Sequence, residues 1–163
     1  MNNDSESSAE KPAQSRRSHK KGRHSHPHSH AREVVLQALY QYEVVNYPLE
    51  EILKFKWLNE KLDPKKEEFC RSKLDGISRD WEALDNVIRS FSDKDFTQIS
   101  IVVRCILRLA IYELMEASLD ARIVMDDIVK LTRKYDGESS VAFVNGIIDR
   151  FEKERLEELT DDK

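Results

Sequence analysis

The sequence predicts an all-α protein of about seven helices, preceded by a basic, disordered tail. Three observations support this fold class. Apolar residues recur at helical spacing from residue 31 onwards, no alternating strand pattern competes with them, and only four glycines and four prolines interrupt the 163 residues. A chain of this length is sufficient for one domain with one hydrophobic core.

The tail covers residues 1–30, which are almost free of apolar residues and rich in Ser, Lys, Arg and His. Such a segment buries too little surface to offset its ordering entropy, so we expect it to be disordered on its own. Residues 1–32 carry seven Lys and Arg against three acids, a net charge of +4, whereas residues 33–163 carry twenty against twenty-eight, a net charge of −8. A basic tail on an acidic body is typical of an interaction segment.

The first half of the body is expected to contain four helical segments. Apolar residues fall on one face of residues 31–46, which predicts the first helix. Pro48 suits a first helical turn, and residues 48–58 carry the apolar side of a second segment. Two more helices are expected at 65–78 and 80–92, with a break between them near residues 76–79.

The second half is expected to contain the most buried helix. Residues 101–117 are apolar nearly all round, and Ser100 is placed to cap them. Arg108 and Glu113 interrupt this stretch; a buried charge requires a partner, so we interpret both as structural polar anchors rather than site residues.

Two helices complete the body. Apolar residues predict a helix over 121–135, which Gly137 ends. Either Ser139 or Ser140 can cap the last helix, which is expected to run to about residue 159 with a charged end.

The inventory of residues argues against catalysis. No histidine follows residue 30, so the body lacks a Ser-His-Asp or Cys-His site, and the four glycines are too far apart for a phosphate-binding loop. Cys70 and Cys105 have no metal-ligand spacing, and Cys105 fits a core thiol. We therefore expect neither an enzyme nor a cofactor. No apolar run is long enough to span a membrane, and we expect a cytoplasmic protein.

Histidines alternate along the end of the tail, at His24, His26, His28 and His30. Imidazoles at this spacing can chelate zinc or nickel. The favoured interpretation is a solvated tail without a physiological metal, which gains positive charge below about pH 6.5.

The basic residues of the tail indicate a nucleic-acid contact, because flexible cations gain affinity for phosphates through counterion release. These candidates are Arg16, Arg17, Lys20, Lys21, Arg23 and Arg32. Tyr40 and Phe143 would stack on unpaired bases if exposed, although by spacing alone each fits the core as well.

Three stretches resemble the motifs of the bacterial NusB transcription antitermination family. Residues 31–40 read AREVVLQALY, residues 106–114 read ILRLAIYEL, and residues 143–149 read FVNGIID, in the order and at the spacing of that family. The resemblance covers residues 31–151 and implies a NusB-like RNA-binding domain over 31–160, built from two small packed helical bundles.

The resemblance also implies a function. The family binds single-stranded boxA RNA in ribosomal RNA leader transcripts together with NusE, a small-subunit ribosomal protein. With other Nus factors on RNA polymerase, this pair suppresses premature termination. Some relatives form homodimers that mask the RNA face.

Motif positions that hold RNA in the family nominate Arg32, Gln37, Tyr40 and Phe143 in this chain. Several departures from the family's usual residues are visible, among them residues 125–128, which read Met-Asp-Asp-Ile where I-N-E-A is usual. Residues 28–30 read His-Ser-His where arginines are common, and Ser139 and Val103 stand where acids are common.

Two other classes of function stay open at this point. One is a helical dimerisation or scaffold module that no longer reads RNA. The other is the NusB-like domain of a ribosomal RNA cytosine methyltransferase, which would need a Rossmann-like cofactor domain behind it; the sequence has none before its last residue, Lys163.

Overall fold

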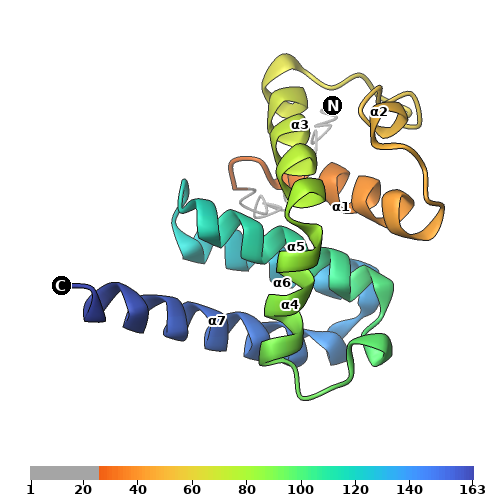
Figure 1. The fold of residues 1–163 in the computed structure, drawn as a ribbon. Coiled ribbons are helices and arrows are strands. Elements are labelled where there is room, and N and C mark those ends of the chain that lie inside the picture. The colour runs from red at the N-terminus through yellow and green to blue at the C-terminus, as the bar shows by residue number, and fades with distance from the viewer. Residues whose placement is uncertain (1–25) are drawn as a thin grey trace, which may run out of the picture.

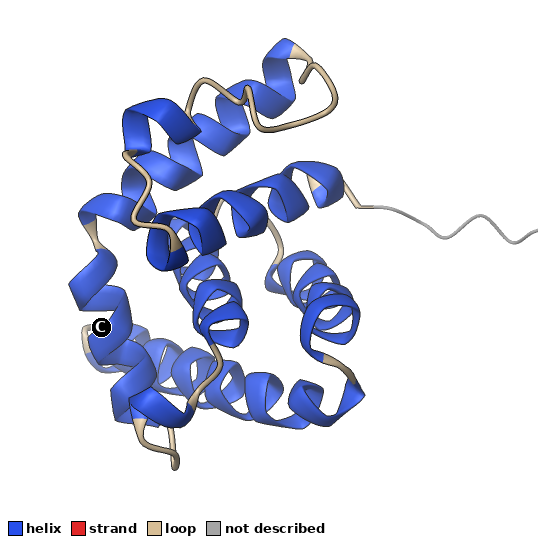
Figure 2. Cartoon of the chain, turned by 90° about the vertical axis from the view of Figure 1, so that its right-hand side faces the viewer, coloured by secondary structure: helices blue, strands red, loops and turns tan. Residues whose placement is uncertain are grey.

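The computed structural model describes residues 26–163. These residues form helices joined by short connections and contain no strand (Figure 1, Figure 2). The expected all-α fold with seven α-helices is confirmed, and two 3-10 turns are added to it. In chain order the elements are α1 (Ser29–Val44), α2 (Leu49–Ile52), α3 (Pro64–Arg79), α4 (Trp81–Phe91), η1 (Phe96–Gln98), α5 (Ile101–Glu116), α6 (Ala121–Asp136), η2 (Glu138–Ser140) and α7 (Val141–Asp161).

Helix α5 is the central element, as its apolar sequence predicts. It is in contact with α1 and α3 on one side and with α4, α6 and α7 on the other, and most of its side chains are buried. Ser100 caps it as expected, because its Oγ accepts the Val103 N–H at 3.2 Å. Helix α5 thus contacts helices from both halves of the chain, and all of them enclose one continuous core (Figure 1).

The break between α3 and α4 falls at Asp80, one residue beyond the predicted range. Gly76 lies inside α3 and does not break the helix. It permits a close approach instead: a Cβ built at Gly76 would lie 1.8 Å from the hydroxyl oxygen of Tyr112 on α5. A side chain at residue 76 would therefore have to displace the Tyr112 ring.

The expected helix over residues 48–58 is wrong beyond its first turn. Helix α2 ends at Ile52, and Phe55 adopts a φ of 53°, a left-handed conformation incompatible with a continuing helix. The indole N–H of Trp57 donates to the carbonyl of Ile52 at 3.0 Å, which satisfies one of the acceptors that the missing turn would have used. The apolar residues of this segment pack on the core from a loop.

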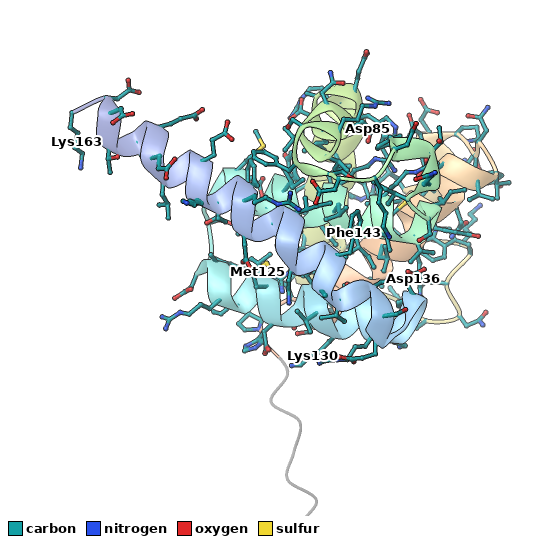
Figure 3. All side chains as sticks on the ribbon, turned by 90° about the horizontal axis from the view of Figure 1, so that it is seen from below. Asp85, Met125, Lys130, Asp136, Phe143 and Lys163 are labelled. Atoms are coloured by element: carbon teal, nitrogen blue, oxygen red, sulfur yellow. The ribbon has the colours of Figure 1, made fainter. Side chains whose placement is uncertain are left out.

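Ser140 stands at the cap position of α7, but it does not cap by its side chain. Its hydroxyl donates to the carboxylate of Asp136, at the end of α6, so it joins two helices. Helix α7 then runs beyond the rest of the body towards Lys163 (Figure 3). Within residues 26–163, no helix is both long and apolar enough to cross a membrane.

The close approach at Gly76 makes a prediction about stability. Gly76→Ala should lower the free energy of unfolding by about 1–2 kcal/mol, because the added methyl group overlaps the Tyr112 ring. In a Tyr112→Ala background the same change should instead raise it by up to about 1 kcal/mol, because alanine favours the helix when there is room for its side chain. Urea unfolding of the four proteins measures both differences; equal effects in the two backgrounds would contradict the proposed overlap.

Candidate nucleic-acid interface

Helix α1 begins at Ser29, two residues earlier than expected. Arg32 lies in its first turn, on the buried side of the helix. The Arg32 guanidinium donates from Nε and Nη2 to Glu113 of α5, at 2.7 and 2.9 Å, and from Nη1 to Asp127 of α6 at 2.6 Å. Its side chain is 0% exposed. Burial alone would lower the pKa of Arg32, but the hydrogen bonds to these two carboxylates outweigh it and raise the pKa.

The segment before α1 closes this cluster from outside. The Arg32 Nη1 also donates to the carbonyl of Pro27 at 3.1 Å, and the Ser29 hydroxyl lies 2.8 and 2.9 Å from the two carboxylate oxygens of Asp127. Each of the three guanidinium nitrogens of Arg32 thus donates to an acceptor within the protein. A direct contact between Arg32 and RNA stays a prediction, and it would require this cluster to open.

A second buried arginine joins the other side of α5 to the body. Arg108 donates to Asp85 of α4 at 2.6 Å and to Glu43 of α1 at 2.5 Å, and its Cζ lies 3.8 Å from the ring centroid of Trp81. The interpretation of Arg108 and Glu113 as structural anchors is confirmed, since both are buried and paired. Among the described residues, no buried side-chain polar atom lacks a hydrogen-bond partner.

Gln37 and Tyr40, the next two predicted contacts, lie together on the outer face of α1. With Leu36, Val102 and Tyr135 they line a hollow of about 210 Å³. Gln37 donates to the Tyr135 hydroxyl at 2.9 Å, and that hydroxyl donates to Glu33 at 2.6 Å. Tyr40 is 41% exposed, so its ring is available to a partner, whereas Gln37 is held by a protein contact.

Phe143 lies near the start of α7, half-buried against the core (Figure 3). The ammonium group of Lys94, in the loop after α4, lies 4.5 Å from the centroid of its ring. The ammonium group lies over one face of the ring, so a base can stack there if Lys94 swings aside to neutralise a phosphate of the same nucleotide. Sequence reasoning missed Lys94, because nothing along the chain indicates that residues 94 and 143 meet.

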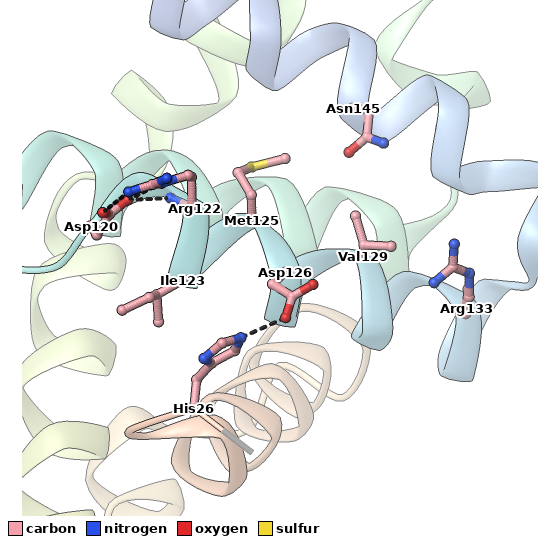
Figure 4. Close-up of a pocket in the computed structure, with 9 residues that line it drawn as sticks. All are labelled: His26, Asp120, Arg122, Ile123, Met125, Asp126, Val129, Arg133 and Asn145. Carbon is pink, nitrogen blue, oxygen red and sulfur yellow. Dashed lines mark hydrogen bonds and ion pairs between the residues drawn. The ribbon is translucent and has the colours of Figure 1, made fainter. Parts of the chain in front are cut away.

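A shallow groove of about 850 Å³ runs between α6 and the Asn145 side of α7 (Figure 4). His26 lies at its edge, with Nε2 2.5 Å from the Asp126 carboxylate. Its arginines are paired with acids, Arg122 with Asp120 and Arg133 with Glu138. The mixed charge makes this groove a weaker phosphate site than the surface around Phe143.

The basic tail residues predicted to bind RNA lie outside the described residues: Arg16, Arg17, Lys20, Lys21 and Arg23. His24 lies there too, which leaves the alternating histidines incomplete. Within residues 26–163, no group of His, Cys, Asp and Glu side chains is arranged to hold a metal ion. Cys70 and Cys105 are both free and buried, and burial raises the pKa of each thiol to about 12.

Comparison with known proteins supplies the context for this surface. The sequence profile described as the NusB family matches residues 29–153. The chain is 32% identical over 127 residues to the transcription antitermination protein NusB of Leptospira biflexa serovar Patoc, covering 77% of this chain and 91% of that protein. It is also 32% identical over 129 residues to the NusB protein of Elusimicrobium minutum, covering 77% and 92%.

Solved structures agree with the sequence relatives. The fold is similar to that of T. maritima NusB, with a TM-score of 0.70 at 34% identity over 80% of this chain and 94% of that one. It is also similar to a chain in a structure of the antitermination factors NusB and NusE in complex with double-stranded RNA. There the TM-score is 0.66 at 26% identity, over 77% and 95% of the two chains.

The Arg32 cluster predicts a large cost of mutation. Arg32→Gln should lower the free energy of unfolding by about 3–5 kcal/mol at neutral pH, because it leaves two buried carboxylates without their cation.

Chemical unfolding at neutral pH measures this cost. Arg122→Gln is the matched control, because the Arg122 side chain is 91% exposed and should contribute almost nothing. A deficit for Arg32→Gln no larger than that of Arg122→Gln would count against the buried cluster.

Proposed function

The chain belongs to the NusB family, and on that premise we propose that it is a transcription antitermination factor that binds boxA-type single-stranded RNA together with NusE. The observation that carries the proposal is the extent of the match. Residues 29–153 contain every helix of the described chain except the end of α7. A structural relative crystallised with NusE and double-stranded RNA supports NusE and RNA as partners.

We propose an RNA surface made of three parts. The tail cations Arg16, Arg17, Lys20, Lys21 and Arg23 supply neutralising charge. Tyr40 and Gln37 contribute the outer face of α1 to this surface. Phe143, at the start of α7, and Lys94 form its third part. Arg32 belongs to this site as the residue that fixes the start of α1, because its side chain is buried among carboxylates.

The protein acts by binding rather than by catalysis. Its body contains no histidine after residue 30, and both cysteine thiols are buried with raised pKa values, which makes them poor nucleophiles. We propose that it works in the cytoplasm with the other Nus factors on RNA polymerase. We also propose that the protein forms a homodimer when no RNA is bound. Its mass in solution, measured without RNA, would show whether it is a dimer.

Binding of a boxA-type RNA tests the proposed function. We expect tighter binding when NusE is present than when it is absent. If the protein neutralises about five phosphates, the logarithm of the binding constant should fall with the logarithm of salt concentration at a slope of roughly −3.5. Replacing the five tail cations by glutamine should reduce this slope, because fewer counterions are released. Filter binding across a salt series measures all three quantities.

Absence of binding to this RNA, with and without NusE, would contradict the proposed function. An unchanged slope in the tail variant would contradict only the tail's role. A scrambled RNA of the same length is the control, since it retains the phosphates and loses the sequence.

Stacking on Phe143 is tested separately. Phe143→Leu should weaken RNA binding about tenfold, the loss expected for one base–aromatic stack. Leucine retains the apolar contact with the core, so circular dichroism should be unchanged. Phe55→Leu is a matched control, because Phe55 is also half-buried with a cation, Arg71, 5.5 Å from its ring centroid. Equal RNA affinities for the two variants would exclude Phe143 from the interface.

A further inference from the structure

The imidazole of His28 is stacked on the ring of Phe69 from α3. Their ring centroids are 4.4 Å apart and the ring planes differ by 12°. His28 is exposed while Phe69 is half-buried. One face of the imidazole is therefore covered by Phe69, and the residue as a whole remains open to solvent.

The backbone around His28 holds this ring in place. His28 has a φ of 69°, in the left-handed region that residues with a Cβ seldom adopt. Its carbonyl accepts the Arg32 N–H at 2.8 Å, and its neighbours Pro27 and Ser29 are bonded to the buried cluster of Arg32 and Asp127. The side chain itself makes no cap hydrogen bond to α1. Hydrogen bonds thus fix the backbone on both sides of His28, and the contact of its ring is the stack on Phe69.

Desolvation, helped by nearby cations, favours the neutral form of the ring. Contact with the body partly desolvates the imidazole, and this desolvation and the charge of Arg32 lower its pKa; Glu113 opposes them, and Lys73 lowers it further. The Lys73 ammonium lies 4.9 Å from the Phe69 centroid and the Arg32 Cζ lies 5.7 Å from it. A neutral ring at pH 7 is an apolar stacking surface rather than another cation.

His28 differs in this respect from its neighbours. His26 and His30 are each bonded to a carboxylate, with Nε2 2.5 Å from Asp126 and 2.6 Å from Glu60. Their rings are thus held by polar contacts at their edges. Among the histidines that the structure describes, His28 alone is stacked on an aromatic ring.

Cations for a phosphate lie on the same face of α3 as Phe69. Lys65 and Lys66 precede Phe69 by four and three residues, a spacing that places side chains on one helix face. Lys65 is exposed; the Lys66 side chain is 42% exposed, and its ammonium group lies 3.9 Å from the Asp63 carboxylate, an exposed pair that a phosphate can replace. A nucleotide whose base reached His28 would find these ammonium groups within the same surface.

We infer that the His28–Phe69 stack is a further RNA-binding site, which takes one unpaired nucleobase on the outer face of the His28 imidazole. Single-stranded RNA is commonly held by stacking of bases on aromatic rings, histidine included. Phe69 acts as a positioning residue that supports the imidazole, and Lys65 and Lys66 face the phosphate of the same nucleotide. The inference rests on the proposed RNA-binding function and adds a third aromatic position to Tyr40 and Phe143.

Fluorescent RNA tests this site directly in the full-length protein. A boxA-type RNA carrying 2-aminopurine at one position at a time reports stacking as a loss of fluorescence. We expect one position to be quenched by the wild-type protein and by His28→Phe, and to lose this quenching with His28→Ala. RNA affinity should fall about tenfold for His28→Ala and be retained by His28→Phe, since phenylalanine preserves the stack without the imidazole nitrogens.

His30→Ala is the matched control, because it removes a neighbouring histidine bonded to Glu60 and leaves the stack intact; its affinity should stay within about twofold of wild type. Since His28 is exposed, its variants should fold, and circular dichroism verifies this. Unchanged binding by His28→Ala would overturn the inference. Tighter binding by His28→Ala would also overturn it, because the imidazole would then be blocking the Phe69 ring from RNA rather than binding RNA itself. If the wild-type protein bound no RNA, the proposed function would fail as well.

Discussion

The structure depends on the pairing of two buried arginines with carboxylates from other helices. Removing a guanidinium from water is costly, and only well-aligned hydrogen bonds to anions compensate for it. Arg32 meets this requirement through Glu113 and Asp127, and Arg108 through Glu43 and Asp85. Each arginine therefore links three helices, α1, α5 and α6 for Arg32 and α1, α4 and α5 for Arg108, and few other arrangements of these helices would leave both clusters satisfied. The apolar core supplies most of the burial, while the arginines specify which faces meet.

Much of this fold could be predicted from the sequence, because helical periodicity directly reflects which side of a helix is buried. The central helix, its Ser100 cap and the anchors Arg108 and Glu113 follow from one apolar stretch interrupted by two charges. The loop after α2 could not be predicted, since its apolar residues pack on the core at a spacing that a helix would also produce. Its end depends on the left-handed backbone of Phe55, which the sequence does not indicate.

The site was less predictable than the fold, because a motif position does not say which way a side chain points. Arg32 and Tyr40 belong to the same motif and the same helix, yet one is 0% exposed and the other 41%. The contact between Lys94 and Phe143 joins residues far apart in the chain, and the stack of His28 on Phe69 joins a tail residue to α3. Such contacts depend on how helices are placed relative to one another, which periodicity leaves undetermined. The proposed RNA surface combines aromatic rings with cations, whereas Arg32, the arginine of the first motif, is buried and holds helices together.

The link between Arg32 and Glu113 spans 81 residues of sequence. A ribosome releases α1 long before α5, so the first three helices emerge without the carboxylate that Arg32 needs and without most of the surface they will cover. Closing so long a loop is entropically unfavourable until α5 supplies its contacts. Helices α1 and α3 therefore gain their full set of contacts only after α5 has been synthesised.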